Sequence, residues 1–125
     1  MPILRITSLP FEHQDSADWA SAISAQFSKI TEIPLKNVSV AWHLLHGGHY
    51  SYKGVSVNFQ PHDSHPMIVE VMLPDFYALD RVELIIKAVV ESICRVTKMP
   101  KENIFVQVNR ARSGAVYDDG RIIRW

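Results

Sequence analysis

The sequence predicts a two-layer α+β fold, in which a β-α-β motif occurs twice and builds a four-stranded mixed sheet with two helices on one face. The first observation behind this prediction is an internal repeat, because identical residues recur 66 positions apart, and 64 apart near the start of each half. A two-residue difference in the loop before the helix accounts for the change. The recurring residues include Pro2 and Pro66, Pro10 and Pro74, Thr31 and Thr97, Pro34 and Pro100, Asn37 and Asn103, Gly48 and Gly114, and Gly54 and Gly120. We therefore expect one domain over residues 1–125, with pseudo-repeats at about 2–60 and 66–125.

The second observation is that both halves contain the same order of local patterns. Each half opens with a β-type run, at residues 2–7 and 67–73, and the second of these runs is almost continuously apolar. Another β-type run follows each predicted helix, at 38–43 and 104–109. Because a helix connects the two strands of each half, we expect those strands to be parallel. Residues 120–125 could add an edge strand.

Between the two strands of each half, apolar residues at spacings of three and four predict a helix with one core-facing stripe. Asp15 or Ser16 can cap the first helix, and Asp80 with Glu83 resembles a capping box at the start of the second. Both helices are expected to end before a proline. The stripes are Trp19, Ile23, Phe27 and Ile30, then Leu79, Val82, Ile86, Val89, Ile93 and Val96, and the prolines are Pro34 and Pro100. Two helices cover only one face of such a sheet, so we expect a partner subunit on the other.

Composition and charge narrow the class of protein. Hydrophobic residues make up 47% of the 125, which indicates a chain with a real core. Thirteen basic residues balance thirteen acidic ones, so no charge excess favours nucleic acid or an anionic membrane. The single cysteine, Cys94, allows no internal disulfide and fits a reducing compartment. With no signal-peptide pattern and no membrane-length apolar run, we expect a cytoplasmic protein.

Pro2 is the residue with the clearest chemistry. Removal of Met1 before this small residue would give the chain an N-terminal proline, whose secondary amine no internal residue can supply. The ordinary pKa of an α-amino group, about 7.7–8.0, lies near neutral, and apolar surroundings lower it further. A base with such a pKa suits proton abstraction next to a carbonyl.

These residues resemble a known family. A proline after the initiator methionine and a doubled β-α-β chain resemble the tautomerase superfamily. Residues 33–40, continuing to Gly48-His49-Tyr50, are similar to oxalocrotonate tautomerase, whereas the length and duplication resemble the macrophage migration inhibitory factor branch. The resemblance implies a homotrimer, Pro2 as catalytic base, a small-molecule substrate, and no cofactor or metal.

The resemblance also implies substrate-binding residues. In oxalocrotonate tautomerase, an aromatic residue after Gly-His lies near the proline, and Tyr50 has that position here. In the inhibitory factor branch, a neighbouring subunit contributes an aromatic residue and an amide from the second strand of its second half. Phe105 and Gln107 match these positions, and their spacing of two directs both to one face of the strand.

The basic residues with which this family holds anions are absent from their usual places; Ser39, for example, stands where oxalocrotonate tautomerase has an arginine. Arg110 and Arg112 follow the strand of Phe105 and Gln107 and could hold a carboxylate in a bidentate manner. The alternative is that both are solvated loop arginines, paired with acidic neighbours such as Asp118.

A histidine-rich stretch raises the question of a metal site, because imidazole is the commonest metal ligand. The spacing is not that of a helix, since Gly47-Gly48 opposes one, and on a strand a spacing of three directs side chains to opposite faces. We therefore expect no metal and interpret the stretch as a loop that titrates below neutral pH. The histidines are His43, His46, His49, His62 and His65.

Three functions remain from the sequence. The first is a tautomerase-like enzyme that uses Pro2 as general base for keto–enol tautomerization of a small keto acid or enol. The second is a tautomerase-fold trimer with a binding or regulatory role and no significant catalysis, which the missing arginines favour. The third is a metal-binding trimer that uses the histidines. Partners other than a small molecule and further copies of the chain are not expected.

Overall fold

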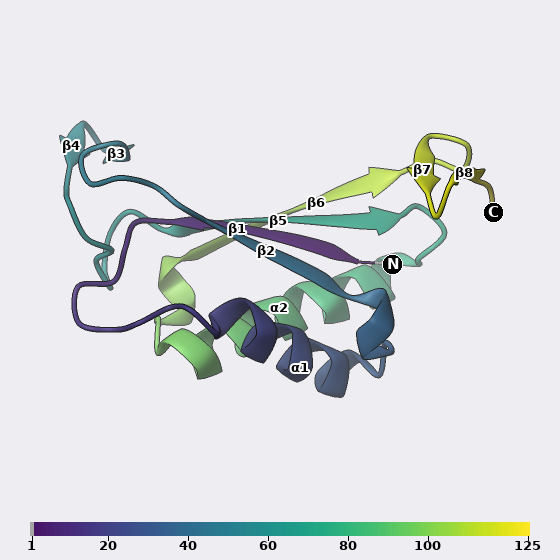
Figure 1. The fold of residues 1–125 in the computed structure, drawn as a ribbon, viewed down its shortest axis with the longest axis horizontal. Helices are drawn as coiled ribbons and strands as arrows, with labels where there is room; N and C mark the ends of the chain where they lie inside the picture. The colour runs from purple at the N-terminus through teal and green to yellow at the C-terminus, as the bar shows by residue number, and fades with distance from the viewer. Residues whose placement is uncertain (1) are drawn as a thin grey trace.

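The computed structural model describes residues 2–125 as a twisted sheet covered on one face by two helices (Figure 1). The strands of this sheet lie in the order β2-β1-β5-β6, and two short hairpins stand apart from it. The elements are β1 (Ile3–Ser8), α1 (Trp19–Thr31), β2 (Ser39–Leu44), β3 (Ser51–Tyr52), β4 (Val55–Ser56), β5 (Met67–Pro74), α2 (Leu79–Thr97), β6 (Ile104–Ala111), β7 (Val116–Asp118) and β8 (Arg121–Ile123).

The sheet is mixed, as the sequence predicts. Each half contributes a parallel pair, β1 with β2 and β5 with β6, joined through a helix. The two halves meet where β1 runs antiparallel to β5. The predicted fold class, a four-stranded mixed sheet with two helices on one face, is therefore confirmed.

The core lies between the sheet and the two helices. Alternate residues of β1 and β5 face the helices and are fully buried, which is the period-two pattern of a strand with one covered face. Apolar residues of α1 and α2 at helical spacing meet them. Leu79 of the predicted stripe is an exception, because it stands at the first position of α2 and is exposed. The largest buried side chains are Phe27, Leu4, Ile6, Leu9, Ile23, Met67, Leu73, Ile85, Ile93 and Met99.

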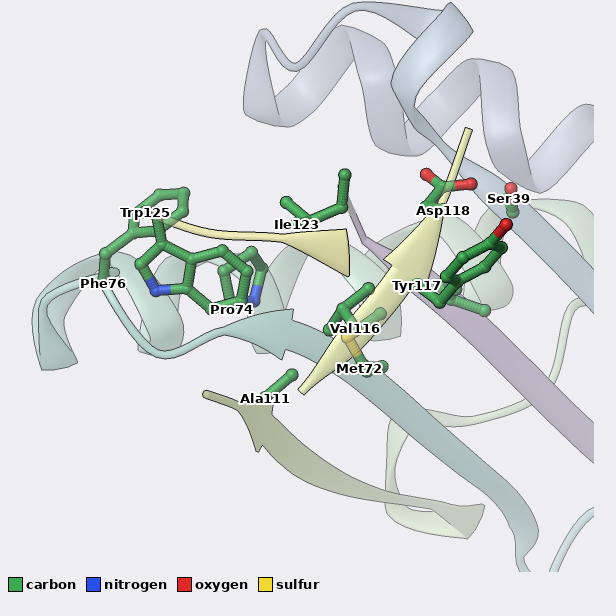
Figure 2. A pocket seen from close by; sticks show the side chains of 11 residues that line it. Ser39, Met72, Pro74, Phe76, Ala111, Val116, Tyr117, Asp118, Ile123 and Trp125 are labelled. Carbon is green, nitrogen blue, oxygen red and sulfur yellow. The ribbon is translucent and has the colours of Figure 1, made fainter. Parts of the chain in front are cut away.

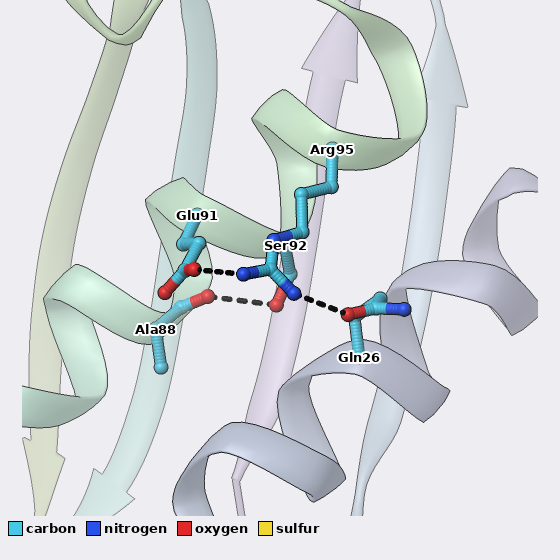
Figure 3. Close-up of polar contacts among 5 residues, drawn as sticks. All are labelled: Gln26, Ala88, Glu91, Ser92 and Arg95. Atoms are coloured by element: carbon cyan, nitrogen blue, oxygen red, sulfur yellow. Dashed lines mark hydrogen bonds and ion pairs between the residues drawn. The ribbon is translucent and has the colours of Figure 1, made fainter.

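The two helices are also linked across their exposed side (Figure 3). The Arg95 guanidinium on α2 donates to the Glu91 carboxylate at 2.5 Å, one turn back, and to the Gln26 side-chain oxygen on α1 at 3.3 Å. Because these groups are solvent-exposed, the contacts contribute little to stability. They indicate that α1 and α2 pack side by side beneath the sheet.

The two halves repeat one another in backbone conformation as well as in sequence. Glu32 and Lys98, 66 residues apart, both end their helix in the left-handed region, with φ of 63° and 65°. Just before them, the Thr31 and Thr97 hydroxyls each donate to a carbonyl four residues back, at 2.7 Å. Both helices thus end before Pro34 and Pro100, as the sequence predicts. Both also end with the same left-handed residue and the same threonine hydrogen bond.

The structure corrects the predicted helix starts. The first helix begins at Trp19, and the Asp15 carboxylate instead accepts from the Ala17 amide in the preceding turn. The second helix begins at Leu79, so Asp80 lies inside its first turn and bonds the Arg81 amide rather than capping the helix. No side-chain cap bond forms at either start within the described part of the chain.

The predicted edge strand at 120–125 is also corrected. Residues Arg121–Ile123 form β8, which pairs with β7 in a hairpin separate from the main sheet. Gly120, at a φ of 75°, makes the tight turn between them. The equivalent hairpin of the first half, β3-β4, lies at the opposite end of the sheet (Figure 1).

Alternation along the strands leaves the other sheet face uncovered in a single chain. Side chains of this face form cross-strand rows, one of which contains Arg5, Glu70 and Gln107. The face is mixed in character, since Phe105 and Ile68 lie in the next row. Neither helix has the length and apolar character needed to cross a membrane, over residues 2–125.

Candidate active site

A cavity of about 340 Å³ opens at the end of the sheet where β1 begins and where β5 and β6 end (Figure 2). The C-terminal hairpin β7-β8 forms its far wall, so we call it the C-terminal cavity. Its lining is predominantly apolar and includes three aromatic rings. The lining residues are Ile3, Ser39, Met72, Pro74, Phe76, Ala111, Val116, Tyr117, Asp118, Ile123 and Trp125.

Pro2 adjoins this cavity. It is buried, it immediately precedes Ile3, and its carbonyl accepts a hydrogen bond from the Ser39 amide at 3.1 Å. Ile3 and Ser39 both line the cavity, and Ile3 also pairs with Met72 across the β1–β5 ladder. Met1, whose removal would free the proline nitrogen, lies outside the described residues.

Arg110, one of the two predicted anion-binding residues, is engaged elsewhere. One of its guanidinium nitrogens donates to the Asp75 carbonyl at 2.7 Å and also to the Tyr77 carbonyl. Arg110 therefore holds the loop between β5 and α2. Arg112 is exposed, and neither arginine lines the C-terminal cavity. Neither arginine forms an ion pair with an aspartate within 4 Å among residues 2–125, so the predicted alternative of pairing with acidic neighbours is not observed either.

Phe105 and Gln107 lie on β6 and face the uncovered side of the sheet, as their spacing predicts. Phe105 is opposite Ile68, whereas Pro2 lies beyond Ile3, which is opposite Met72. The two positions are thus at different ends of the sheet within one chain. Phe105 and Pro2 therefore lie apart within one chain, and the family resemblance implies that Phe105 and Gln107 reach the proline of a neighbouring subunit.

Tyr50 lies at the end of the sheet opposite Pro2. Its hydroxyl donates to the Pro66 carbonyl at 2.7 Å, and its ring contacts His65 at a centroid distance of 5.1 Å. Burial, and to a lesser degree the neighbouring Tyr52, raise the pKa of the Tyr50 phenol above its ordinary value. Through its hydroxyl bond to Pro66 and its contact with His65, Tyr50 closes the region beside Pro66 in its own chain.

The repeat explains why one end is open and the other is filled. Pro66 is the counterpart of Pro2, and Val116 is the counterpart of Tyr50, 66 residues on. At the Pro66 end, Tyr50 and the nearly fully buried His65 occupy the space. At the Pro2 end, Val116 is one wall of the C-terminal cavity. At the Pro2 end the small Val116 side chain leaves space open, whereas at the Pro66 end the larger Tyr50 phenol fills the equivalent space.

Sequence reasoning missed the residues of the C-terminal hairpin that line the cavity, above all Tyr117, Asp118 and Trp125. The signal that could have found them is the 66-residue offset. It relates 51–56 to 117–122, so a hairpin placed near one proline implies an equivalent hairpin near the other.

The histidines do not gather around one point. His46 and His49 lie edge to face at 5.8 Å, while His65 is buried, with Nε2 donating to the Val55 carbonyl at 2.7 Å. Across residues 2–125, no three histidine, cysteine or acidic side chains are placed to hold a metal ion.

Comparison with known proteins identifies the fold. No protein-family model and no curated protein matches the sequence. Three similar solved structures are Pt0534 inactivated by 2-oxo-3-pentynoate (TM-score 0.79, 18% identity, 97% of this chain and 94% of that one), the asymmetric trimer of R7 fused 4-OT (0.78, 15%, 96% and 94%), and the macrophage migration inhibitory factor from Trichinella spiralis (0.69, 15%, 95% and 97%). The predicted resemblance to the tautomerase superfamily is therefore confirmed at the level of the fold.

Proposed function

We propose that this protein is a tautomerase-like enzyme in which the amine of Pro2, freed by removal of Met1, is the general base. The substrate is a small keto acid or enol, and the reaction moves a proton between carbon and oxygen. The observation that carries the proposal is that the buried start of β1 adjoins an apolar cavity large enough for a small molecule.

The chemistry follows from the surroundings of the amine. Burial lowers the pKa of an amine because it disfavours the cation, so a neutral base is available near pH 7. This amine takes a proton from the carbon next to the carbonyl, and the negative charge moves to the oxygen. The resulting ammonium then gives its proton to that oxygen, which leaves the enol and a neutral amine.

Several groups can steady the enolate oxygen. The Ser39 and Tyr117 side chains carry hydroxyl donors on the cavity lining. Gln107 of a neighbouring subunit is a further donor in the trimer that we propose. Preorganised donors in a site that excludes water act on the charge as it develops.

The uncovered sheet face supports the homotrimer. It presents apolar Phe105 and Ile68 beside the row of Arg5, Glu70 and Gln107, a surface with both apolar and complementary polar groups. The similar structure of R7 fused 4-OT is a trimer. A trimer would bring β6 of one subunit toward the Pro2 end of the next.

A second candidate is a ligand-binding or regulatory trimer of the same fold without significant catalysis. It is favoured by one observation: no arginine or lysine of residues 2–125 lines the C-terminal cavity. Binding would then be the function of the cavity, and Pro2 would be a structural residue.

The test combines intact mass with turnover on one sample of untagged protein. Ketonization is followed for the enol forms of phenylpyruvate and of its methyl ester, in the wild type and in Pro2→Ala. The proposal predicts a mass lower by one methionine and turnover of at least one enol, reduced about 100-fold or more in Pro2→Ala.

The repeat supplies a matched control. Pro66→Ala changes the counterpart proline, whose backbone carbonyl remains free to accept from Tyr50, and it should leave turnover unchanged. Loss of turnover in both variants to the same degree would indicate structural damage and contradict the assignment of Pro2. A processed protein that turns over neither enol would favour the binding candidate.

A further inference from the structure

Three aromatic rings line the C-terminal cavity, and contacts with neighbouring residues hold one of them, Trp125. Trp125 contacts Phe76 edge to face at a centroid distance of 5.7 Å. The Trp125 indole nitrogen donates to the Asp75 carboxylate at 2.8 Å, and its backbone amide donates to the Ser113 hydroxyl at 2.7 Å. Tyr117 adds a third ring to the lining (Figure 2). Phe76 and Trp125 contact one another, whereas Tyr117 is exposed, and the three rings present flat apolar surfaces that suit an aromatic ligand.

Asp118 is the one charged residue that lines the cavity in the described chain. It is half-buried, and its carboxylate accepts from the Asp119 amide at 2.9 Å. Arg121 is opposite it in the β7–β8 ladder, yet no basic group of residues 2–125 lies within 4 Å of the Asp118 carboxylate as an ion pair. Asp118 therefore brings to the lining a carboxylate that has no ion-pair partner among residues 2–125.

No arginine of residues 2–125 lines the C-terminal cavity. Arg110 is bound to the carbonyls of Asp75 and Tyr77, and Arg112, Arg121 and Arg124 are exposed. A carboxylate in the cavity would meet the Asp118 carboxylate and no fixed cation of the lining. Like charges in a partly desolvated site repel one another strongly.

We infer that the C-terminal cavity takes an aromatic ligand without negative charge and discriminates against carboxylates through Asp118. As a statement about substrate, this inference rests on the proposed function and narrows it, from a keto acid or enol to an uncharged or cationic aryl ketone or enol. The affinity of the cavity is a separate property that needs no turnover.

The experiment uses three unreactive probes of matched size: 3-phenylpropanamide, 3-phenylpropylamine and 3-phenylpropanoate. Their dissociation constants are measured by titration calorimetry with the full chain. Trp125 fluorescence locates the site, since Trp19 and Trp42 lie together on α1 and β2, outside the cavity. We expect the amide and the amine to bind at least about tenfold more tightly than the carboxylate, with a fluorescence change that Trp125→Phe abolishes.

Asp118→Asn removes the charge and keeps an oxygen for the Asp119 amide, so the turn is preserved. In this variant the preference should fall to about threefold or less. Asp119→Asn is the matched control: it removes the same charge one residue away, outside the lining, and should leave the preference intact.

Equal or tighter binding of 3-phenylpropanoate by the wild type would overturn the inference, as would failure to bind any probe or an unchanged preference in Asp118→Asn. These outcomes are separate from the fate of the proposed function. If the probes behave as expected while Pro2→Ala has no effect on turnover, the inference about the ligand stands and the catalytic proposal fails.

Discussion

At the scale of single residues, the structure separates arginines that hold the chain from arginines that could hold a ligand. Arg110 and Arg112 are equivalent in the sequence, because both follow the strand predicted at 104–109 and both carry a guanidinium. In the structure β6 extends to Ala111 and includes Arg110. In space, only Arg110 reaches back to the β5–α2 loop, where its donors meet two carbonyls. A sequence pattern gives the chemistry of a side chain but not which neighbour that chemistry serves.

Arg110→Ala should therefore destabilise the protein, whereas Arg112→Ala should not. The first substitution leaves the carbonyls of Asp75 and Tyr77 without their donor, and exposed hydrogen bonds of this kind contribute about 1 kcal/mol. We expect urea unfolding to show that loss for Arg110→Ala and a change below about 0.5 kcal/mol for Arg112→Ala. Equal effects of the two substitutions would contradict the structural role of Arg110.

At the scale of elements, local patterns located the strands and helices well and the hairpins poorly. Periodicity and the two helix-ending prolines depend on nearest neighbours, so they can be interpreted from a short window. The separate pairing of β7 with β8 depends on where β6 stops, at Ala111, whose carbonyl accepts from the Asp75 amide. Such a contact is not visible in a short window, and the wall of the cavity was missed because the 66-residue offset was not applied to the hairpins.

One buried side chain holds the loops at the Pro66 end. The Gln60 oxygen accepts from the Leu9 amide at 3.1 Å, and its nitrogen donates to the carbonyls of Pro61 and His65, at 3.1 and 2.7 Å. Gln60 thus joins the segment after β1 to the segment before β5. It was not predicted, because glutamine in a loop is usually a solvated residue.

We expect Gln60→Leu to lower the free energy of unfolding by about 1–3 kcal/mol, since it leaves buried backbone groups unpaired. Chemical denaturation measures this loss. Gln14→Leu is the matched control, because Gln14 is exposed in a loop, and its effect should stay within about 0.5 kcal/mol. A Gln60 variant as stable as the control would show that the Gln60 hydrogen bonds do not stabilise the fold.

At the scale of the whole molecule, the duplication gives two similar ends of which one is open. The prediction of a covered second sheet face came from the number of helices, since two helices cover only one face, and the structure shows the other face to be mixed. Arg5 and Glu70 lie opposite one another there. The sequence could indicate that a partner is needed, but not which row of residues meets it.

Glu70→Lys should break the proposed trimer. It places a second cation beside Arg5 on the uncovered sheet face, which in our proposal a neighbouring subunit covers. Sedimentation should give three times the chain mass of 14.2 kDa for the wild type and a smaller species for the variant. Glu83→Lys makes the same charge change on exposed α2 and should remain trimeric. A wild-type monomer would contradict the proposed assembly.

The central claim is that the Pro2 nitrogen acts as a free amine, and one comparison tests it most directly. An alanine inserted between Met1 and Pro2 keeps the proline ring and turns its nitrogen into an amide. We predict that kcat/KM for ketonization of the methyl ester enol falls about 100-fold or more, while circular dichroism and the sedimentation coefficient stay as in the processed wild type. Equal kcat/KM in the two proteins would contradict the account, because catalysis would then not depend on the Pro2 amine.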